Sequence, residues 1–132
     1  AGAVVEGVLV SPMRERGLEL FVGCARDPVW GAVLAVGLGG IFVEVLDDVA
    51  LRVLPVSPAE VRRMLGELKG NKLLGGQRGI PAVDLDAVAE AVARIGTAAV
   101  ALGPDLEALD VNPLWVRGAE VQALDALATW RN

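Results

Sequence analysis

Short apolar runs separated by turn residues fill the first 56 positions of the chain and predict strands. The runs are rich in Val and Leu, and each is closed by Pro, Gly or an Asp-Pro pair. We expect a meander of antiparallel strands, with a glycine loop, "GLGG" at 37–40, before the last two. The expected strands span 4–13, 18–25, 30–37, 41–45 and 49–56.

The spacing becomes helical in the middle of the chain. "SPAE" at 57–60 combines an N-cap serine, a proline at the first helical position and a glutamate three residues after the cap. It predicts a helix that continues to about Lys69, followed by a short helix or turn over 71–79. The strongest helix is expected from about Asp84, its N-cap, to Ala101. Its apolar face consists of Leu85, Val88, Val92, Ile95, Ala99 and Leu102.

Three more strands are expected after Gly103-Pro104, over 106–112, 113–118 and 120–126. The order is therefore strands, helices, strands. This order is typical of the α+β class, with a mostly antiparallel sheet and helices packed on one side. We find no internal repeat and no linker, so residues 1–132 are expected to form a single domain.

Composition and charge exclude several classes of function. Apolar residues make up 54% of the chain and the net charge is -5 without a basic run, which argues against disorder and against nucleic-acid binding. No apolar run is long enough for a membrane span, and the start lacks a secretory pattern and reads like the middle of a domain. The single Cys24 lies in an apolar run and is expected to be a packed residue in a reducing cytoplasm.

The chain contains no histidine. This excludes a Ser-His-Asp triad, a Cys-His pair and a His-ligated zinc within the chain itself. Any metal would need oxygen ligands, which points to a hard cation such as magnesium.

The stretch "LDVNPLWV" at 109–116 places an acid, an amide and a proline inside an apolar run. Residues i and i+2 of a strand point to the same face, so Asp110 and Asn112 should project together. A turn around Gly118 could fold Asp125 back near Asn112, and the two oxygens would suit a partial magnesium site. Alternatively, Asn-Pro forms a turn and Asp125 caps a last helix. Spacing leaves both interpretations open.

Two further features have a plain and a functional interpretation. "GLGG", which contains Gly39 and Gly40, is either a hairpin turn or a loop whose backbone N–H groups surround an anion. Glu19 interrupts an apolar strand, on the face shared with Phe21 and Gly23. It either faces solvent or accepts hydrogen bonds from ribose hydroxyls.

Three single charges complete the candidates. Glu44 and Arg52 lie in apolar strands and either pair across a hairpin or face a ligand. Arg78, in the glycine-rich "GGQRG", either binds phosphate through its guanidinium fork or is a solvated loop residue.

Taken in order, the motifs "EGVLVSPM", "GLELFVGCARDPVWGAVLAVGLGGIFVEVLDDVALRVLP", "LLGGQRG", "LDVNPLWV" and "ALDAL" resemble the ATP-grasp domain of NDP-forming acyl-CoA synthetases, relatives of the succinyl-CoA ligase beta subunit. The resemblance covers nearly the whole chain. It implies the C-terminal ATP-grasp subdomain, without the preceding subdomain that carries a nucleotide-binding lysine and a glycine-rich loop.

The resemblance also implies residue roles. Leu9, Val10 and Ser11 would form the hinge that meets the purine, although the family commonly has Gln or Glu where Ser11 stands. Glu19 would approach the ribose. Asn112 and Asp125 would hold magnesium on the nucleotide phosphates, and Asp110 would lie near a phosphohistidine of a partner domain. Looser phosphate or partner-loop contacts are implied for Gly39, Gly40, Glu44, Arg52 and Arg78.

The implied activity is a relay in which a histidine on another domain or subunit carries a phosphoryl group between an acyl phosphate and a nucleotide. The implied cofactors are Mg²⁺ and ATP/ADP or GTP/GDP. The implied partners are the missing subdomain, a CoA-binding phosphohistidine domain, CoA and a small carboxylic acid, with self-association of the truncated piece also expected. The alternatives are a non-catalytic regulatory module with this fold and a carboxylate-amine ligase of the ATP-grasp group.

Overall fold

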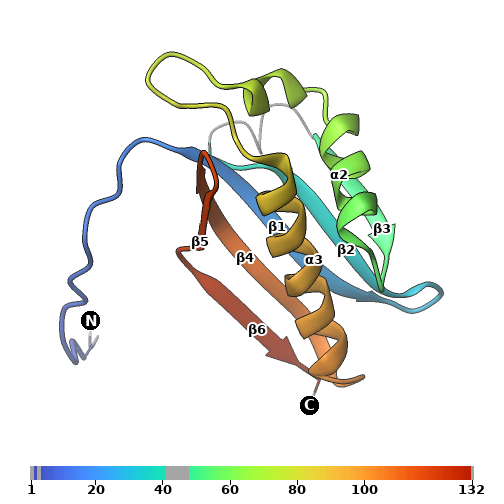
Figure 1. Ribbon diagram of the computed structural model, residues 1–132. Helices are drawn as coiled ribbons and strands as arrows, with labels where there is room; N and C mark the ends of the chain where they lie inside the picture. The colour runs from blue at the N-terminus through green and yellow to red at the C-terminus, as the bar shows by residue number, and fades with distance from the viewer. Residues whose placement is uncertain (1, 3, 41–47, 132) are drawn as a thin grey trace.

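A computed structural model describes residues 2, 4–40 and 48–131, which form an antiparallel sheet with helices on one face (Figure 1). Six strands of the described residues pair in the order β3-β2-β1-β4-β5, with β6 pairing separately along β4. This confirms the α+β class. The elements are β1 (Leu18–Asp27), β2 (Gly31–Leu38), β3 (Val49–Val53), α2 (Pro58–Glu67), the 3-10 helix η1 (Asn71–Gly75), α3 (Leu85–Ala101), β4 (Leu106–Arg117), β5 (Glu120–Ala123) and β6 (Ala126–Trp130).

Strand β4 organises the second half of the sheet. It pairs along most of its length with β1, while its far edge pairs with β5 at one end and with β6 at the other. Helices α2 and α3 lie between β3 and β4 in the sequence. Both helices cover the same face of the sheet (Figure 1). Among the described residues, no helix lies on the opposite face of the sheet, which we call the helix-free face (Figure 1).

The core lies between the helices and the sheet. Alternate residues of β1 and β2 point toward the helices and are fully buried, as the two-residue period of a strand requires. Each buried Val or Leu contributes about 1.5–3 kcal/mol relative to an exposed one. The side chains without solvent exposure are Leu20, Val22, Leu34, Val36, Val61, Met64, Leu65, Val88, Val92 and Val116.

Both helices begin where the sequence predicts. The Ser57 hydroxyl accepts a hydrogen bond from the backbone N–H of Glu60 at 3.2 Å. The Asp84 carboxylate accepts from Asp86 and Ala87, so it caps α3 as expected. No helix of the described residues is long and apolar enough to cross a membrane.

Asp48 is buried and joins the start of β3 to the end of α2. Its side chain is 6% exposed, and its two carboxylate oxygens accept hydrogen bonds from the backbone N–H groups of Lys69 and Gly70, each at 2.7 Å. Gly70 has no room for a side chain, because a Cβ would stand 2.2 Å from a methyl carbon of Leu38. Asp48 therefore fixes where the polypeptide enters η1.

Several predicted strands are wrong in extent. Residues 4–13 form no strand, because no described strand lies beside them to pair with their backbone groups. The strands expected at 106–112 and 113–118 are one strand, β4, and the strand expected at 120–126 is split into β5 and β6. β3 ends at Val53, since the following Pro55 has no N–H to donate to a ladder. The strand expected at 41–45 lies outside the described residues.

Cys24 is the packed residue that the sequence predicts. It lies in β1, is 3% exposed and is a free thiol. Burial away from water raises its pKa to about 11, because the thiolate would lose its hydration. The thiol is therefore neutral at physiological pH, which argues against a nucleophilic role.

Candidate functional site

Asp110 and Asn112 project from the helix-free face of the sheet. Both side chains are exposed, whereas Val111 between them is buried toward the helices. The same-face placement predicted from their spacing is therefore confirmed. In register, Asp110 lies between Gly23 of β1 and Leu127 of β6.

A β-bulge shapes the strand at Asn112. Leu20 pairs with Leu114 and Val22 pairs with Val111, so the single residue Phe21 of β1 faces both Asn112 and Pro113 of β4. The Asn112-Pro113 peptide bond is cis. Proline is tolerated inside a strand at a bulge, where no ladder hydrogen bond is needed from it. The interpretation of Asn-Pro as a turn is therefore wrong, and the bulge sets the direction of the Asn112 side chain.

Asp125 returns to Asn112 through the hairpin of β4 and β5. The backbone N–H of Leu124 donates to Pro113 at 3.0 Å, and the N–H of Asn112 donates to the carbonyl of Asp125 at 3.2 Å. The Asp125 carboxylate uses one oxygen to accept from Ala126 at 2.9 Å. Asp125 thus lies between β5 and β6. The expectation that it caps a last helix is wrong, because a strand follows it.

The donors at this point suit a hard cation. Asn112 offers an amide oxygen and Asp125 a carboxylate, and these two residues are neighbours through their backbones. Within the described ranges, no three His, Cys, Asp or Glu side chains gather in a way that could hold a metal. Magnesium commonly binds one or two protein oxygens and takes its other ligands from phosphate and water. The residues present fit such a site.

Glu19 and the glycine loop meet at the start of β1, two residues before Phe21. The N–H of Gly39 donates to the carbonyl of Glu19 at 2.7 Å. A Cβ at Gly39 would stand 3.0 Å from the Glu19 backbone, and one at Gly40 would stand 3.4 Å from its carboxylate. Gly40 also has φ = 67°, a conformation that favours glycine. The glycines therefore leave the Glu19 carboxylate accessible.

Two contiguous hollows surround Glu19, and we call them together the Glu19 groove. The first, of about 400 Å³, is lined by Arg16, Gly17, Leu18, Glu19, Gly39, Gly40, Gln77, Arg78 and Ile80. The second, of about 450 Å³, shares four of these residues and extends along Pro12, Met13, Arg14, Glu15, Trp115 and Leu124. Leu124 directly precedes Asp125. The groove thus connects Glu19, Arg78 and the glycine loop with the neighbourhood of the candidate metal ligands.

The other predicted residues lie apart from the groove. Leu9, Val10 and Ser11 are exposed, and Leu9 is 94% accessible to solvent. They precede Pro12, which lines the groove. Glu44 lies outside the described residues.

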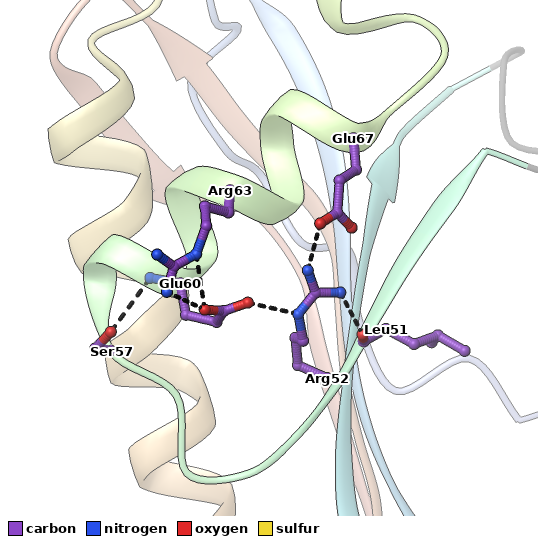
Figure 2. Close-up of polar contacts among 6 residues, drawn as sticks. All are labelled: Leu51, Arg52, Ser57, Glu60, Arg63 and Glu67. Carbon is purple, nitrogen blue, oxygen red and sulfur yellow. Dashed lines mark hydrogen bonds and ion pairs between the residues drawn. The ribbon is translucent and has the colours of Figure 1, made fainter.

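Arg52 is part of an ion cluster between β3 and α2 (Figure 2). Its Nε lies 2.6 Å from the Glu60 carboxylate, and its terminal nitrogens contact Glu67 and the carbonyl of Leu51. Arg63 donates to the same Glu60 carboxylate at 2.9 Å. The hydrogen bonds that Arg52 donates to Glu67 and then to Glu60 raise the pKa of Arg52. The hydrogen bonds that Glu60 accepts from Arg52 and then from Arg63 lower the pKa of Glu60. This placement between strand and helix does not support a phosphate contact.

Sequence reasoning missed Arg16 and Trp115, which line the groove, and Arg117, which contacts Glu15 and Arg16 beside it. Trp115 and Arg117 lie in a predicted strand, and Arg16 lies between two predicted strands. No local pattern distinguishes them, because their contacts join segments about 100 residues apart.

Comparison with known proteins then places the chain. The sequence model of the ATP-grasp domain matches residues 1–129. The chain belongs to the ATP-grasp domain family. Among curated relatives, this ATP-grasp chain is 38% identical over 120 residues to the beta subunit of acetate–CoA ligase [ADP-forming] I of Pyrococcus furiosus, covering 91% of the chain and 51% of the relative. It is 42% identical over 125 residues to a trans-feruloyl-CoA synthase of an unknown prokaryotic organism, covering 93% of the chain and 18% of the relative.

A solved structure gives the same assignment. The dinucleotide forming acetyl-coenzyme A synthetase 1 of Ca. Korarchaeum cryptofilum, in complex with coenzyme A and Mg-AMPPCP, matches with a TM-score of 0.81 and 37% identity, over 89% of this chain and 55% of that one. The resemblance to acyl-CoA synthetases and the C-terminal ATP-grasp subdomain fold are therefore confirmed. The chain spans about half the length of the acetate–CoA ligase subunit and less than a fifth of the feruloyl-CoA synthase.

Proposed function

We propose that this chain is the nucleotide- and magnesium-binding portion of an ADP-forming acyl-CoA synthetase, which converts an acid, CoA and NTP into acyl-CoA, NDP and phosphate. The observation that carries the proposal is that the backbones of Asn112 and Asp125 are hydrogen-bonded to each other beside the bulge of β4, in a sheet with this fold. It is supported by the structural relative in complex with coenzyme A and Mg-AMPPCP, which matches this chain with a TM-score of 0.81.

In this proposal, the chain positions the nucleotide and neutralises its charge. Asn112 and Asp125 would hold Mg²⁺, and the ion would offset the negative charge of the nucleotide phosphates. Glu19 accepts hydrogen bonds from the ribose hydroxyls, and the backbone at 9–11 meets the purine. ATP/ADP and GTP/GDP are both compatible with these roles.

The phosphoryl relay would need residues outside this chain. The chain has no histidine, and the structural relative contains a phosphohistidine segment that points towards its nucleotide binding site. We infer that a CoA-binding phosphohistidine domain or subunit meets the exposed Asp110, and that the preceding ATP-grasp subdomain closes over the Glu19 groove. A cytoplasmic location, expected from the lone thiol, is part of the same proposal.

Replacing one metal ligand tests the assignment. In the complete protein, Asp125→Asn should lower magnesium-dependent phosphoryl transfer by about 100-fold, equivalent to about 2.7 kcal/mol of lost transition-state stabilisation. The thermal midpoint should change little, because Asp125 is exposed. Activity is measured as ADP release over a magnesium titration.

The matched control is Asp105→Asn, since Asp105 is an equally exposed carboxylate before β4 and lies outside the groove. It should retain activity. Full activity of Asp125→Asn at limiting magnesium would contradict the proposal that Asp125 is a magnesium ligand.

A further inference from the structure

Trp115, on the helix-free face of β4, fixes the segment that precedes β1. Its Nε1–H donates to the carbonyl of Glu15 at 3.1 Å, and the side chain is 5% exposed. The guanidinium of Arg14 lies 6.0 Å from the ring centroid, within the range of a cation–π contact. A Cβ at Gly17 would stand 2.4 Å from Nε1, so the approach of this backbone to the indole requires glycine.

Arg117, two residues further along β4, joins the same segment to the turn at 76–80. Its Nε lies 2.9 Å from the Glu15 carboxylate, and one terminal nitrogen donates to the carbonyl of Arg16 at 2.8 Å. The same nitrogen makes a longer contact, 3.5 Å, to the carbonyl of Gly79. One guanidinium therefore contacts two segments that are about 60 residues apart in sequence.

These two segments are the rims of the Glu19 groove. Arg16 and Gly17 line one side, and Gln77, Arg78 and Ile80 line the other. Glu19 itself is the register partner of Trp115 across β1 and β4. Trp115 and Arg117 thus set the distance between the rims above Glu19.

Residues 14–17, which Trp115 and Arg117 contact, mark where the chain leaves the sheet. Along the described residues, Arg14 and Glu15 are the first with a polar or ring contact to the rest of the domain. The stretch before them, which contains the predicted purine contacts at 9–11, is exposed. Its direction therefore depends on how residues 14–17 are held.

We propose that Trp115 and Arg117 are positioning residues that set the nucleotide affinity of the Glu19 groove by fixing its two rims and the exit direction of residues 9–11. This inference rests on the proposed function. The guanidinium reaches three oxygen acceptors in fixed directions, which the single ammonium of lysine cannot reproduce. Arg117→Lys keeps the charge but should therefore weaken nucleotide binding.

The test compares Arg117→Lys and Glu15→Gln in the complete protein with Arg94→Lys. Arg94 is an exposed residue of α3 whose ion pair is with Glu90 on the same helix. For Arg117→Lys we expect about a tenfold rise in the KM for Mg-ATP, with kcat and the KM for CoA unchanged within about twofold. Glu15→Gln removes the ion pair alone and should raise the same KM by about threefold. Arg94→Lys should change none of these values.

Thermal midpoints and calorimetric titration with Mg-ADP complete the test. A purely structural role would lower the midpoint of Arg117→Lys without separating the KM for nucleotide from that for CoA, and this result would overturn the inference. An unchanged nucleotide affinity in both Arg117→Lys and Glu15→Gln, beside normal binding by the unsubstituted protein, would also overturn it. Absence of Mg-ADP binding by the unsubstituted protein would instead contradict the proposed function.

Discussion

The direction of one side chain, that of Asn112, depends on both local spacing and strand register. Its placement with Asp110 on one face follows from the two-residue period of a strand and was predictable from the sequence. The bulge opposite Phe21 was not predictable, because it arises from the pairing of β4 with a strand almost 90 residues earlier. Local rules therefore leave a turn at Asn112-Pro113 as one of two open interpretations. Pairing with β1 places Pro113 inside a strand.

Cys24 provides a test at the residue scale through its raised pKa. The thiol has an ordinary pKa of 9.0 and a pKa of about 11 in the folded protein. The folded state holds the thiol proton more tightly than the unfolded state does. The contribution of the neutral thiol to the free energy of unfolding is therefore fully present below about pH 9 and is lost as the pH rises through about 11. The loss amounts to about 2–3 kcal/mol, one pKa unit being about 1.36 kcal/mol.

Urea unfolding between pH 8 and pH 11 measures this effect, at pH values set by the two pKa values. The unsubstituted protein should lose more unfolding free energy over this range than Cys24→Ala does. Parallel pH profiles for the two proteins would contradict the burial of the thiol.

Among the elements, the two helices were predicted well because their signals are local. Ser57 and Asp84 each cap a helix that starts one residue later. The partner of Glu60 was not predictable from a local rule. The sequence indicates a capping box, whereas the structure directs this carboxylate to Arg52 and Arg63. Contacts between elements override the local preference.

The Arg52 cluster gives a prediction at the element scale. Arg52→Gln should lower the thermal midpoint at pH 7, because Glu60 and Glu67 on α2 lose their contact with β3 (Figure 2). The pKa of Glu60 is lowered by this contact, so its contribution is present above its ordinary value of 4.5 and is lost as the pH falls through the lowered value. The difference between variant and unsubstituted protein should therefore shrink below pH 4.5 and in high salt.

Arg62→Gln is the control for this measurement. Arg62 contacts the exposed Asp86 of α3, so its loss should lower the midpoint less than the loss of Arg52. An equal loss of stability at pH 7 and in acid for Arg52→Gln would contradict a role through the carboxylates.

At the scale of the whole molecule, the segment at 4–13 explains the largest failure of the sequence prediction. Its richness in Val predicts a strand, but β-structure needs a neighbour, and the described residues provide none. Six large apolar side chains there are at least four-fifths exposed: Val4, Val5, Val8, Leu9, Val10 and Met13. Such exposure is typical of a surface that meets another part of a protein, in agreement with a chain that spans half of a longer relative.

The central claim is that the complete protein is an ADP-forming acyl-CoA synthetase that transfers a phosphoryl group through a phosphohistidine. ATP carrying radiolabelled phosphate tests this claim most directly. The protein is incubated with magnesium and ATP labelled at the γ-phosphate, quenched rapidly and examined for protein-bound label. We predict an acid-labile phosphoprotein, as expected for phosphohistidine, that releases its label as inorganic phosphate when acid and CoA are added together. Formation of a free acyl phosphate without labelled protein would instead indicate a carboxylate-amine ligase, and nucleotide binding without any phosphoryl transfer would indicate a regulatory module. Either result would contradict the account.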